Sequence, residues 1–405
     1  MSHLALCAFL LASCSSNTVP PTDGAVDLAV PLDRSVPASL AVPDLADPLG
    51  QKTLILLGST DGLGTPVVDA STDEAGNLWV ATSDALYVRR LGAAKFRKYT
   101  NTDGLHISYG VSAVAGAGPN EGYLGLIGYE DDLAGNDTDE QKLRGKLEHI
   151  HLLPDGTITS LHYAMLHSDV SDNYYETRSA RRLLYSHQGA SAGHLFLGGN
   201  HGITHIFNDS WGDHVHASVW WMPEKNQRMG EWFGLAIDPA TDGIWTCGRC
   251  ACGLQRWNPD PRAWVSQRPG YQYAFTVFTG DHALEVPSGH EENFRAAAVT
   301  PDGTAWFLSR RYGLASWDPK SKNYKYITVH PLPALGLAMD MVADPDGTLW
   351  IADDQHLWRY RPSNETITPF ALPVSDLRRL SLDDRLTPRA LLISTGDGLI
   401  IFRGK

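Results

Sequence analysis

The chain has 405 residues, of which 43% are hydrophobic and 20% are charged. This composition supports a folded core and excludes global disorder. Its 46 acidic and 33 basic residues give a formal charge of -13, which argues against a nucleic-acid partner because phosphate binding needs clustered Lys and Arg. The 38 Gly and 12 Trp residues favour an all-β chain of short strands and frequent turns.

Residues 1–13 are predicted to be a lipoprotein-type signal peptide. An apolar stretch, Leu4–Leu11, runs into Leu-Ala-Ser ahead of Cys14. This pattern resembles a bacterial lipoprotein signal, which implies cleavage before Cys14 and acylation of its thiol. Met1–His3 contain no Lys or Arg, so the charged segment of such signals is either missing or lies upstream of Met1. The alternative is a chance apolar terminus with a buried cysteine.

Residues 14–50 are predicted to be a disordered linker rich in Pro, Ala and Asp. Ser15–Gly50 contains six prolines and no aromatic residue, so this segment cannot bury a core. Proline favours extended conformations of about 3.1 Å per residue. The segment could therefore hold a folded domain well away from a membrane.

Residues 51–405 repeat a β-hairpin pattern. A small apolar strand, a turn with Asp and Gly, and a second strand opened by an aromatic residue recur along the chain. The clearest copies of the turn and second strand are residues 73–82 (DEAGNLWVAT), 238–245, 300–306 and 344–352. Weaker copies begin at residues 111, 183 and 379.

Spacing of the repeats predicts a seven-bladed β-propeller. The anchor residues of the second strands are Trp79, Tyr123, Phe196, Trp245, Trp306, Trp350 and Leu392. Successive anchors are 44, 73, 49, 61, 44 and 42 residues apart. Four-stranded propeller blades need about 40–45 residues, so three steps fit directly and three require insertions.

The first strand is predicted to close the ring. The last repeat has residues for only three strands, ending at Phe402, and the apolar segment Thr53–Leu57 precedes the first repeat. Pairing this segment with the strand around Ile400 would complete the last blade and remove an exposed edge. Its four aliphatic side chains are expected to be buried.

Residues 76–82 (GNLWVAT), together with Phe96, Tyr99 and Asp103-Gly104-Leu105, resemble the two-component-regulator propeller repeat. The resemblance covers four of the seven repeats well. It implies a periplasmic sensor propeller, of the kind that precedes histidine kinases in bacterial membrane sensors. Such sensors continue into a membrane helix and a kinase, whereas this sequence ends at Lys405, so a sensed signal is expected to pass to another protein.

Three cysteines, Cys247, Cys250 and Cys252, lie within six residues. In an exported protein, a disulfide from Cys247 to either neighbour with one thiol left over is the favoured interpretation. A zinc site is one alternative, although the next twenty residues contain no His to complete it. Thiols that stay unpaired and inert are the other alternative.

Sixteen histidines include the alternating pairs His149/His151 and His214/His216. Alternation places both imidazoles on one face of a strand, as in some metal sites. Solvated strand faces produce the same spacing, so we expect no metal and no cofactor.

Segments that lead into the innermost strands should cluster on one face of the ring. They combine carboxylates, imidazoles, guanidiniums and aromatic rings, which suit recognition of a protein or a glycan. The candidate binding residues are His106, Tyr109, Tyr175, Glu176, Arg178, Glu231, Trp232, His290, Glu291, Glu292, Arg295, Asp340 and Arg378. No catalytic residue is assigned, and polar loops without a ligand are the alternative.

Together these features predict a lipid-anchored, extracytoplasmic binding or sensory protein of the cell envelope, attached to the membrane through its acyl chains alone. The sequence contains no complete catalytic motif such as a nucleophile elbow, so an enzyme is the less favoured interpretation. A polysaccharide lyase or hydrolase and an envelope scaffold are the alternatives, since the fold by itself does not define activity.

We predict that Cys14→Ser abolishes membrane association and leaves the propeller folded. Several acyl chains on one cysteine anchor a protein stably, whereas a single chain does not. Detergent phase separation of wild type and variant measures the effect. Equal partitioning of both proteins into the aqueous phase would contradict the prediction.

Overall fold

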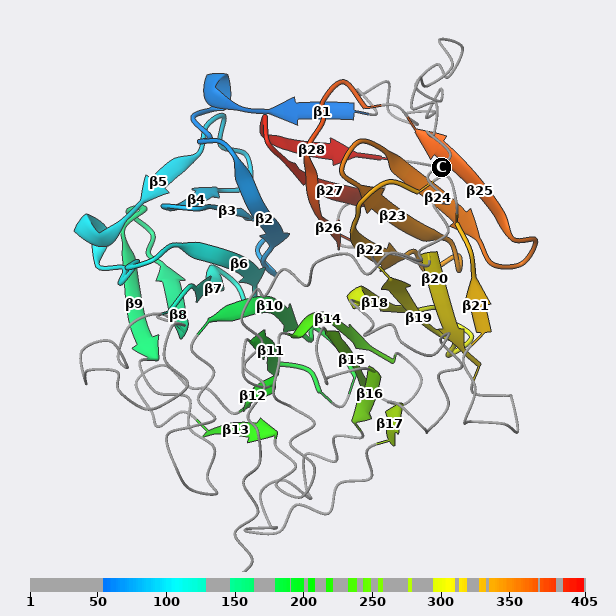
Figure 1. Cartoon of the computed structure of the whole chain (residues 1–405). Helices are drawn as coiled ribbons and strands as arrows, with labels where there is room; N and C mark the ends of the chain where they lie inside the picture. The colour runs from blue at the N-terminus through cyan, green and yellow to red at the C-terminus, as the bar shows by residue number, and fades with distance from the viewer. Residues whose placement is uncertain are drawn as a thin grey trace, which may run out of the picture. The chain divides into compact units, whose positions relative to one another are not determined.

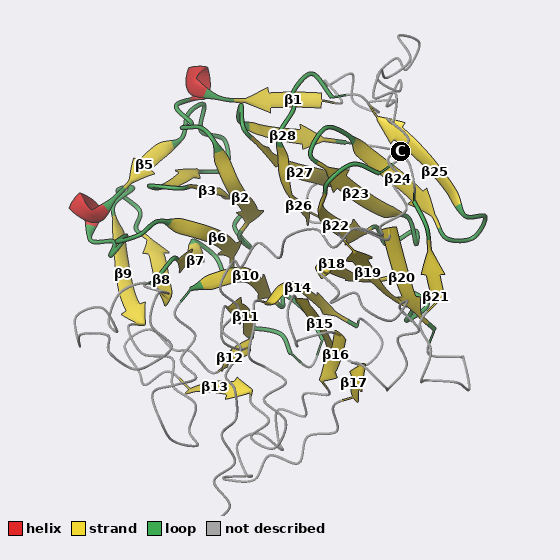
Figure 2. Cartoon of the chain, in the orientation of Figure 1, coloured by secondary structure: helices red, strands yellow, loops and turns green. Residues whose placement is uncertain are grey.

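The computed structural model contains strands throughout the part of the chain that it describes, and two short 3₁₀ helices at Ser59–Asp61 and Asn101–Asp103 (Figure 2). All of these residues belong to one compact unit. The described residues are 54–128, 146–163, 179–189, 191–199, 203–207, 216–220, 232–238, 243–248, 254–257, 276–278, 294–309, 313–318, 328–332, 335–370, 372–383 and 389–403. The predicted signal peptide and linker therefore lie outside them. No helix of the described residues is long and apolar enough to cross a membrane.

The described strands form seven four-stranded antiparallel sheets. Three sheets come from residues 67–220 and follow chain order from the inside outward. They contain β2 (Val67–Thr72), β3 (Leu78–Thr82), β4 (Leu86–Arg89) and β5 (Arg97–Tyr99); β6 (Val111–Gly116), β7 (Glu121–Leu126), β8 (Lys146–Leu152) and β9 (Ile158–Tyr163); and β10 (Ala180–Tyr185), β11 (Leu195–Gly199), β12 (Ile203–Phe207) and β13 (His216–Trp220).

Three further sheets repeat the same order. They contain β14 (Trp232–Ile237), β15 (Ile244–Gly248), β16 (Leu254–Trp257) and β17 (Thr276–Phe278); β18 (Phe294–Val299), β19 (Ala305–Ser309), β20 (Gly313–Trp317) and β21 (Thr328–His330); and β22 (Ala338–Ala343), β23 (Leu349–Asp353), β24 (Leu357–Arg361) and β25 (Thr366–Phe370).

The remaining sheet joins the two ends of the domain, in the order β1-β28-β27-β26. It contains β1 (Leu54–Leu57), β26 (Leu377–Asp383), β27 (Ala390–Thr395) and β28 (Leu399–Phe402). Leu54 pairs with Phe402 and Leu57 with Leu399, so the predicted closure by the first strand is confirmed. Figure 1 shows β1 (blue) beside β28 (red).

The first strands of the sheets surround a common axis (Figure 1). Contacts link them in one closed cycle, in the order β2, β6, β10, β14, β18, β22 and β26 and back to β2. Every predicted anchor residue lies on the second strand of its sheet. The all-β propeller fold predicted from the sequence is therefore confirmed.

The Asp of the repeated turn forms a hydrogen bond with the Trp that follows six residues later, which explains why the two recur together. Asp73 accepts hydrogen bonds from the Asn77 backbone N–H at 2.9 Å and from Trp79 Nε1 at 2.9 Å. The same six-residue step joins Asp344 to Trp350 Nε1 at 3.4 Å. The carboxylate thus satisfies the indole of a ring that is buried between two sheets.

Glycine meets two different demands in these repeats. Gly76 and Gly347 occupy the turns with φ of 81° and 86°, a conformation that other residues adopt at a cost. Gly122 instead provides space, because a Cβ there would lie 2.8 Å from the Trp79 ring. The indole of Trp79 can therefore pack closely against the next sheet.

The closing strand buries less than the sequence suggested. Leu57 is buried, Leu54 and Ile55 are half-buried, and Leu56 is 43% exposed. The expectation of four buried aliphatic side chains was wrong, because β1 is the outermost strand of its sheet and its side chains alternate between the two faces.

Removal of residues 1–57 should lower the thermal midpoint relative to removal of residues 1–50. The longer deletion loses the burial of Leu57, worth about 1.5–3 kcal/mol, and exposes the hydrogen-bonding edge of β28. Circular dichroism melts of the two truncations measure the difference. As matched point variants, Leu57→Ala should cost about 2–5 kcal/mol and Leu56→Ala about 0.5 kcal/mol. Equal midpoints for the truncations would show that β1 does not close the last sheet.

Candidate functional site

A β-bulge occurs near the start of every innermost strand. In each one the register against the second strand shifts by one residue, so two residues oppose one. The residues that follow the bulges occupy equivalent positions around the axis. They are Asp69, Ala113, Arg182, Gly234, Ala296, Asp340 and Arg379. We call this set the axial ring.

Two acidic and two basic residues of the axial ring form a charge cluster, in which the aspartates are buried and the arginines half-buried. Arg182 on β10 donates from Nη1 to Asp340 Oδ2 on β22 at 2.6 Å. These strands are three places apart in the cycle, so the ion pair crosses the axis. Arg379 donates from Nη2 to the Arg181 carbonyl at 2.5 Å. The cluster therefore connects sheets that share no strand pairing.

The two aspartates also join neighbouring inner strands in the same way. Asp69 accepts from the backbone N–H of Ala70 at 3.0 Å and of Val114, on the next inner strand, at 3.1 Å. Asp340 accepts from Met341 at 2.9 Å and from Leu380, again on the next inner strand, at 2.9 Å. Each carboxylate thus satisfies backbone donors of two adjacent sheets.

Burial and charge oppose each other in this cluster. Burial raises the pKa of Asp69, and the nearby Arg379 and Arg182 guanidiniums act in the lowering direction. Burial also acts to lower the pKa of Arg182, but attraction to Asp340 and Asp69 raises it overall. Burial and repulsion from Arg182 lower the pKa of Arg379. The four formal charges sum to zero, as the interior of a folded domain requires.

Cys247 lies beside this cluster. It stands opposite Gly234 in the β14–β15 pair and its side chain is fully buried. Burial raises the pKa of its thiol, and it forms no disulfide within the described part of the chain. Cys250 and Cys252 lie outside the described residues, so the proposed thiol cluster stays a prediction.

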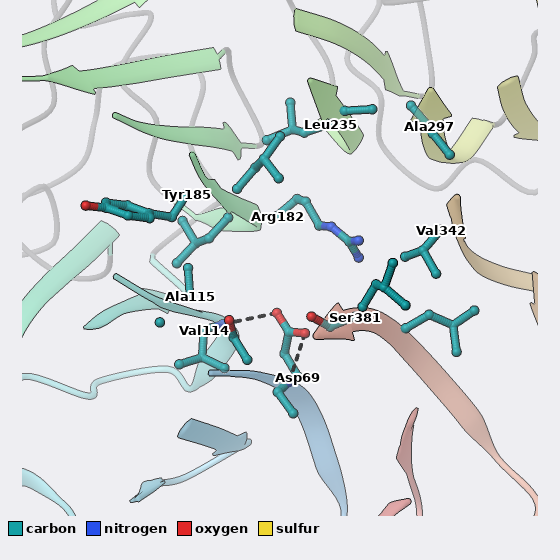
Figure 3. Close-up of a pocket in the computed structure, with 18 of the residues that line it drawn as sticks. Asp69, Val114, Ala115, Arg182, Tyr185, Leu235, Ala297, Val342 and Ser381 are labelled. Atoms are coloured by element: carbon teal, nitrogen blue, oxygen red, sulfur yellow. Dashed lines mark hydrogen bonds between the residues drawn. The ribbon is translucent and has the colours of Figure 1, made fainter. Parts of the chain in front are cut away.

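A cavity of about 280 Å³ follows the axis from the axial ring toward the C-terminal ends of the inner strands. Its walls come from all seven inner strands and are mostly small or apolar, including Ala115, Leu235 and Ala297. Figure 3 shows the Arg182 side chain and Ser381 turned toward its centre and the Asp69 carboxylate bonded to the backbone at its edge. The oppositely charged Asp69 and Arg182 thus line a cavity whose walls are otherwise largely apolar.

Aromatic and imidazole rings continue from the wall of the cavity into the neighbouring sheet. Tyr185 and His187 line the cavity, and their ring centroids are 4.9 Å apart. Tyr185 lies 6.2 Å from Tyr123, which stacks on His149 at 4.3 Å. The His187 Nδ1 atom is 3.5 Å from Glu74 Oε1 at the surface. We call Glu74, Tyr185 and His187 the rim, because they combine a carboxylate, a phenol and an imidazole beside the cavity.

The candidate binding residues predicted from the sequence do not gather around the cavity. Asp340 is buried in the axial ring and bonded to Arg182. Arg378 pairs with Asp376 at 2.6 Å, Tyr109 is 44% exposed, and the Arg295 guanidinium lies 4.5 Å from the centroid of the Phe233 ring. These residues do not line the cavity. Trp232 begins β14. The following candidates lie outside the described residues: Tyr175, Glu176, Arg178, Glu231, His290, Glu291 and Glu292.

Of the charged residues in the axial ring, sequence reasoning named Asp340 but missed Asp69, Arg182 and Arg379, and it also missed the rim. Asp69 and Asp340 share the third position of their inner strands, and Arg182 and Arg379 follow directly on another Arg. Aligning the repeats at the bulge would have shown this signal.

Two groups of histidine and carboxylate side chains have donor atoms close enough to hold a metal ion. They are His106 with Glu148 and His162, and His149 and His151 with Glu121. The predicted alternation of His149 and His151 is thus present on β8. His214 lies outside the described residues, and of His216 only the backbone is described.

No family model matches the chain, and no curated protein matches its sequence. Similar solved structures include the extracellular domain of a putative hybrid two-component system from B. thetaiotaomicron, with a TM-score of 0.57 and 14% identity over 87% of this chain and 41% of that chain. A second is PorZ, a surface component of the type-IX secretion system of Porphyromonas gingivalis, with a TM-score of 0.57 and 15% identity over 84% of this chain and 46% of that chain. This chain thus spans less than half the length of either.

A third similar structure is YCF48 bound to a D1 peptide, with a TM-score of 0.55 and 15% identity. That match covers 92% of this chain and 99% of YCF48. At these identities the likeness shows the β-propeller fold alone.

We predict that Asp340→Ala lowers the free energy of unfolding by about 3–5 kcal/mol, because it leaves Arg182, whose side chain is only 14% exposed, without its partner. Arg378→Ala is the matched control, since it breaks the partly exposed pair with Asp376 and should cost less than about 1 kcal/mol. Urea denaturation measures both. Similar losses for the two variants would show that the cross-axis pair does not hold the ring together.

Proposed function

We propose that this protein is an extracytoplasmic binding or sensory propeller that recognises a segment of another protein at its central axis. The observation that carries the proposal is the axial cavity with the rim beside it. Its small apolar walls suit a side chain of a ligand, while Arg182, Ser381 and the rim offer polar contacts. Such a mixture fixes the orientation of a ligand without a catalytic group.

The charge cluster favours binding over catalysis. Arg182 and Asp340 already bond to each other, and both oxygens of Asp69 and of Asp340 accept backbone hydrogen bonds. A general acid or base must reach the substrate with the proton that it transfers. Groups committed to the framework instead provide a rigid, preorganised wall, which lowers the entropy lost on binding.

Similar proteins support a protein ligand. YCF48 matches this chain over nearly its whole length and its solved structure holds a D1 peptide. The hybrid two-component domain is extracellular and PorZ is a surface component, which supports an extracytoplasmic site of action. We further propose that acylation at Cys14 anchors the chain and that residues 14–50 separate the propeller, residues 51–405, from the membrane.

A glycan ligand is the second candidate. The half-buried Tyr185 beside His187 and the Glu74 carboxylate give the aromatic platform and polar neighbours that sugars require. Parallel screens of the purified full chain on a peptide library and a glycan array separate the two ligand classes.

We predict that Ser381→Trp abolishes binding to the peptides selected by the library screen, because the indole fills the axial cavity. Lys98→Trp, on the outermost strand β5, is the matched control and should bind as wild type does. Fluorescence anisotropy with a labelled library hit measures the affinity, and melting curves verify that both variants fold. Unchanged affinity in Ser381→Trp, or hits from the glycan array alone, would contradict a peptide ligand at the axis.

A further inference from the structure

Three donor side chains meet on the outer part of the sheet formed by β6 to β9. His106 Nδ1 lies 2.8 Å from Glu148 Oε1, and His162 Nδ1 lies 3.0 Å from the same oxygen. The two imidazole rings stack with their centroids 4.7 Å apart. The cluster does not share a residue with the axial cavity, so its role is independent of the proposed peptide binding.

Strand pairing and a fixed loop hold the cluster together. Glu148 on β8 stands directly opposite His162 on β9. His106 arrives from the loop before β6, where Asn101 exchanges two hydrogen bonds with the backbone of Ile107, at 2.8 and 2.9 Å. Ser160 Oγ donates to the Gly104 carbonyl at 2.7 Å and ties this loop to β9. The geometry is therefore set by the backbone before any ligand arrives.

Glu148 is the unusual member of the cluster. Its side chain is fully buried, and a buried carboxylate needs a compensating cation. In the described part of the chain no Lys or Arg pairs with it, and the imidazoles of His106 and His162 are its ion-pair partners. Its Oε2 atom is buried and has no hydrogen-bond partner among the described residues. The unpartnered Oε2 atom leaves this buried carboxylate with room to bind a cation.

We propose that His106, Glu148 and His162 bind a divalent transition-metal ion, with Zn²⁺ as the best-fitting ion. Two imidazoles and one carboxylate are a known ligand set for zinc with an open fourth position. Zinc–ligand bonds of about 2.0–2.2 Å place tetrahedral donors about 3.3 Å apart, close to the observed separations of 2.8 and 3.0 Å. All three donor atoms lie within 4.8 Å of one another.

The position of the site gives the ion both access and a role. The His106 side chain is 57% exposed and that of His162 15%, so the ion reaches the buried carboxylate from the solvent side. Bound there, it links the loop 101–107 to both outer strands of the sheet. Binding to the folded state alone stabilises a protein, so we infer a structural metal that fixes this loop.

Metal binding to the full chain, purified without a histidine tag and stripped with a chelator, tests the proposal. Isothermal titration with Zn²⁺ should show one site in wild type. His106→Ala should lower the Zn²⁺ affinity of this site by more than the roughly 10–100-fold loss that is typical of an outer-shell partner. Zn²⁺ should raise the thermal midpoint of wild type and leave that of His106→Ala unchanged. Because the His106 side chain is exposed, the His106→Ala variant is expected to fold. His162→Ala tests the second imidazole ligand independently.

A matched control separates this site from an isolated histidine–carboxylate pair. His356→Gln removes an imidazole that lies 3.5 Å from the Asp353 carboxylate but belongs to no group of three donors among the described residues, and this variant should bind Zn²⁺ as wild type does. Co²⁺ bound at the proposed site should give visible d–d bands without thiolate charge-transfer absorption, unlike a site at the cysteines. Absence of Zn²⁺ binding by wild type, or equal affinity of wild type and the His106→Ala/His162→Ala double variant, would overturn the proposal.

Discussion

Crowding at the central axis is the constraint on which the rest of this structure depends. Seven inner strands contact one another in a closed cycle, so their backbones approach closely. A Cβ on Gly116 of β6 would lie 2.2 Å from the Thr72 carbonyl oxygen of β2, and one on Gly234 of β14 would lie 2.7 Å from the Ala297 nitrogen of β18. Both distances are shorter than real contacts. Glycine, which has no Cβ, therefore permits the inner strands to approach closely enough at these two positions for the ring to close.

Because the ring is closed, each charged side chain at the axis can contact more than one sheet. Asp69 and Asp340 each accept backbone donors from two neighbouring inner strands, and Arg182 reaches Asp340 across the axis. A hydrophobic side chain of similar size would fill the same space but would satisfy none of these donors, and buried donors without partners are costly. The network therefore favours one arrangement of the sheets, and it leaves the axial cavity with a rigid charged end and apolar walls.

The sheet of β6 to β9 differs from the others in how it uses histidine. His149 stacks on the buried Tyr123 and contributes to the series of rings that leads to the cavity, while Glu148, one residue earlier, faces His106 and His162. Adjacent residues of a strand point to opposite faces, so β8 supplies both a packing surface and the proposed metal site. The alternating pair His149/His151 was visible in the sequence, but the tighter group was not, because its members lie on a loop and two strands.

The sequence pattern and the closure of the ring determine different features of this protein. The sequence by itself determined the repeat, the strand order within each sheet, the turns with Asp and Gly, and the pairing of residues 54–57 with the last repeat, because these depend on neighbours in the chain and on hydrophobic periodicity. Even there it overestimated the burial of Leu56, which depends on what covers an outermost strand. Only the tertiary structure decided that Asp340 meets Arg182 and that Glu148 meets His106. Those partners are separated by 158 and 42 residues, and they come together because closing the ring fixes where each inner strand and each loop must lie.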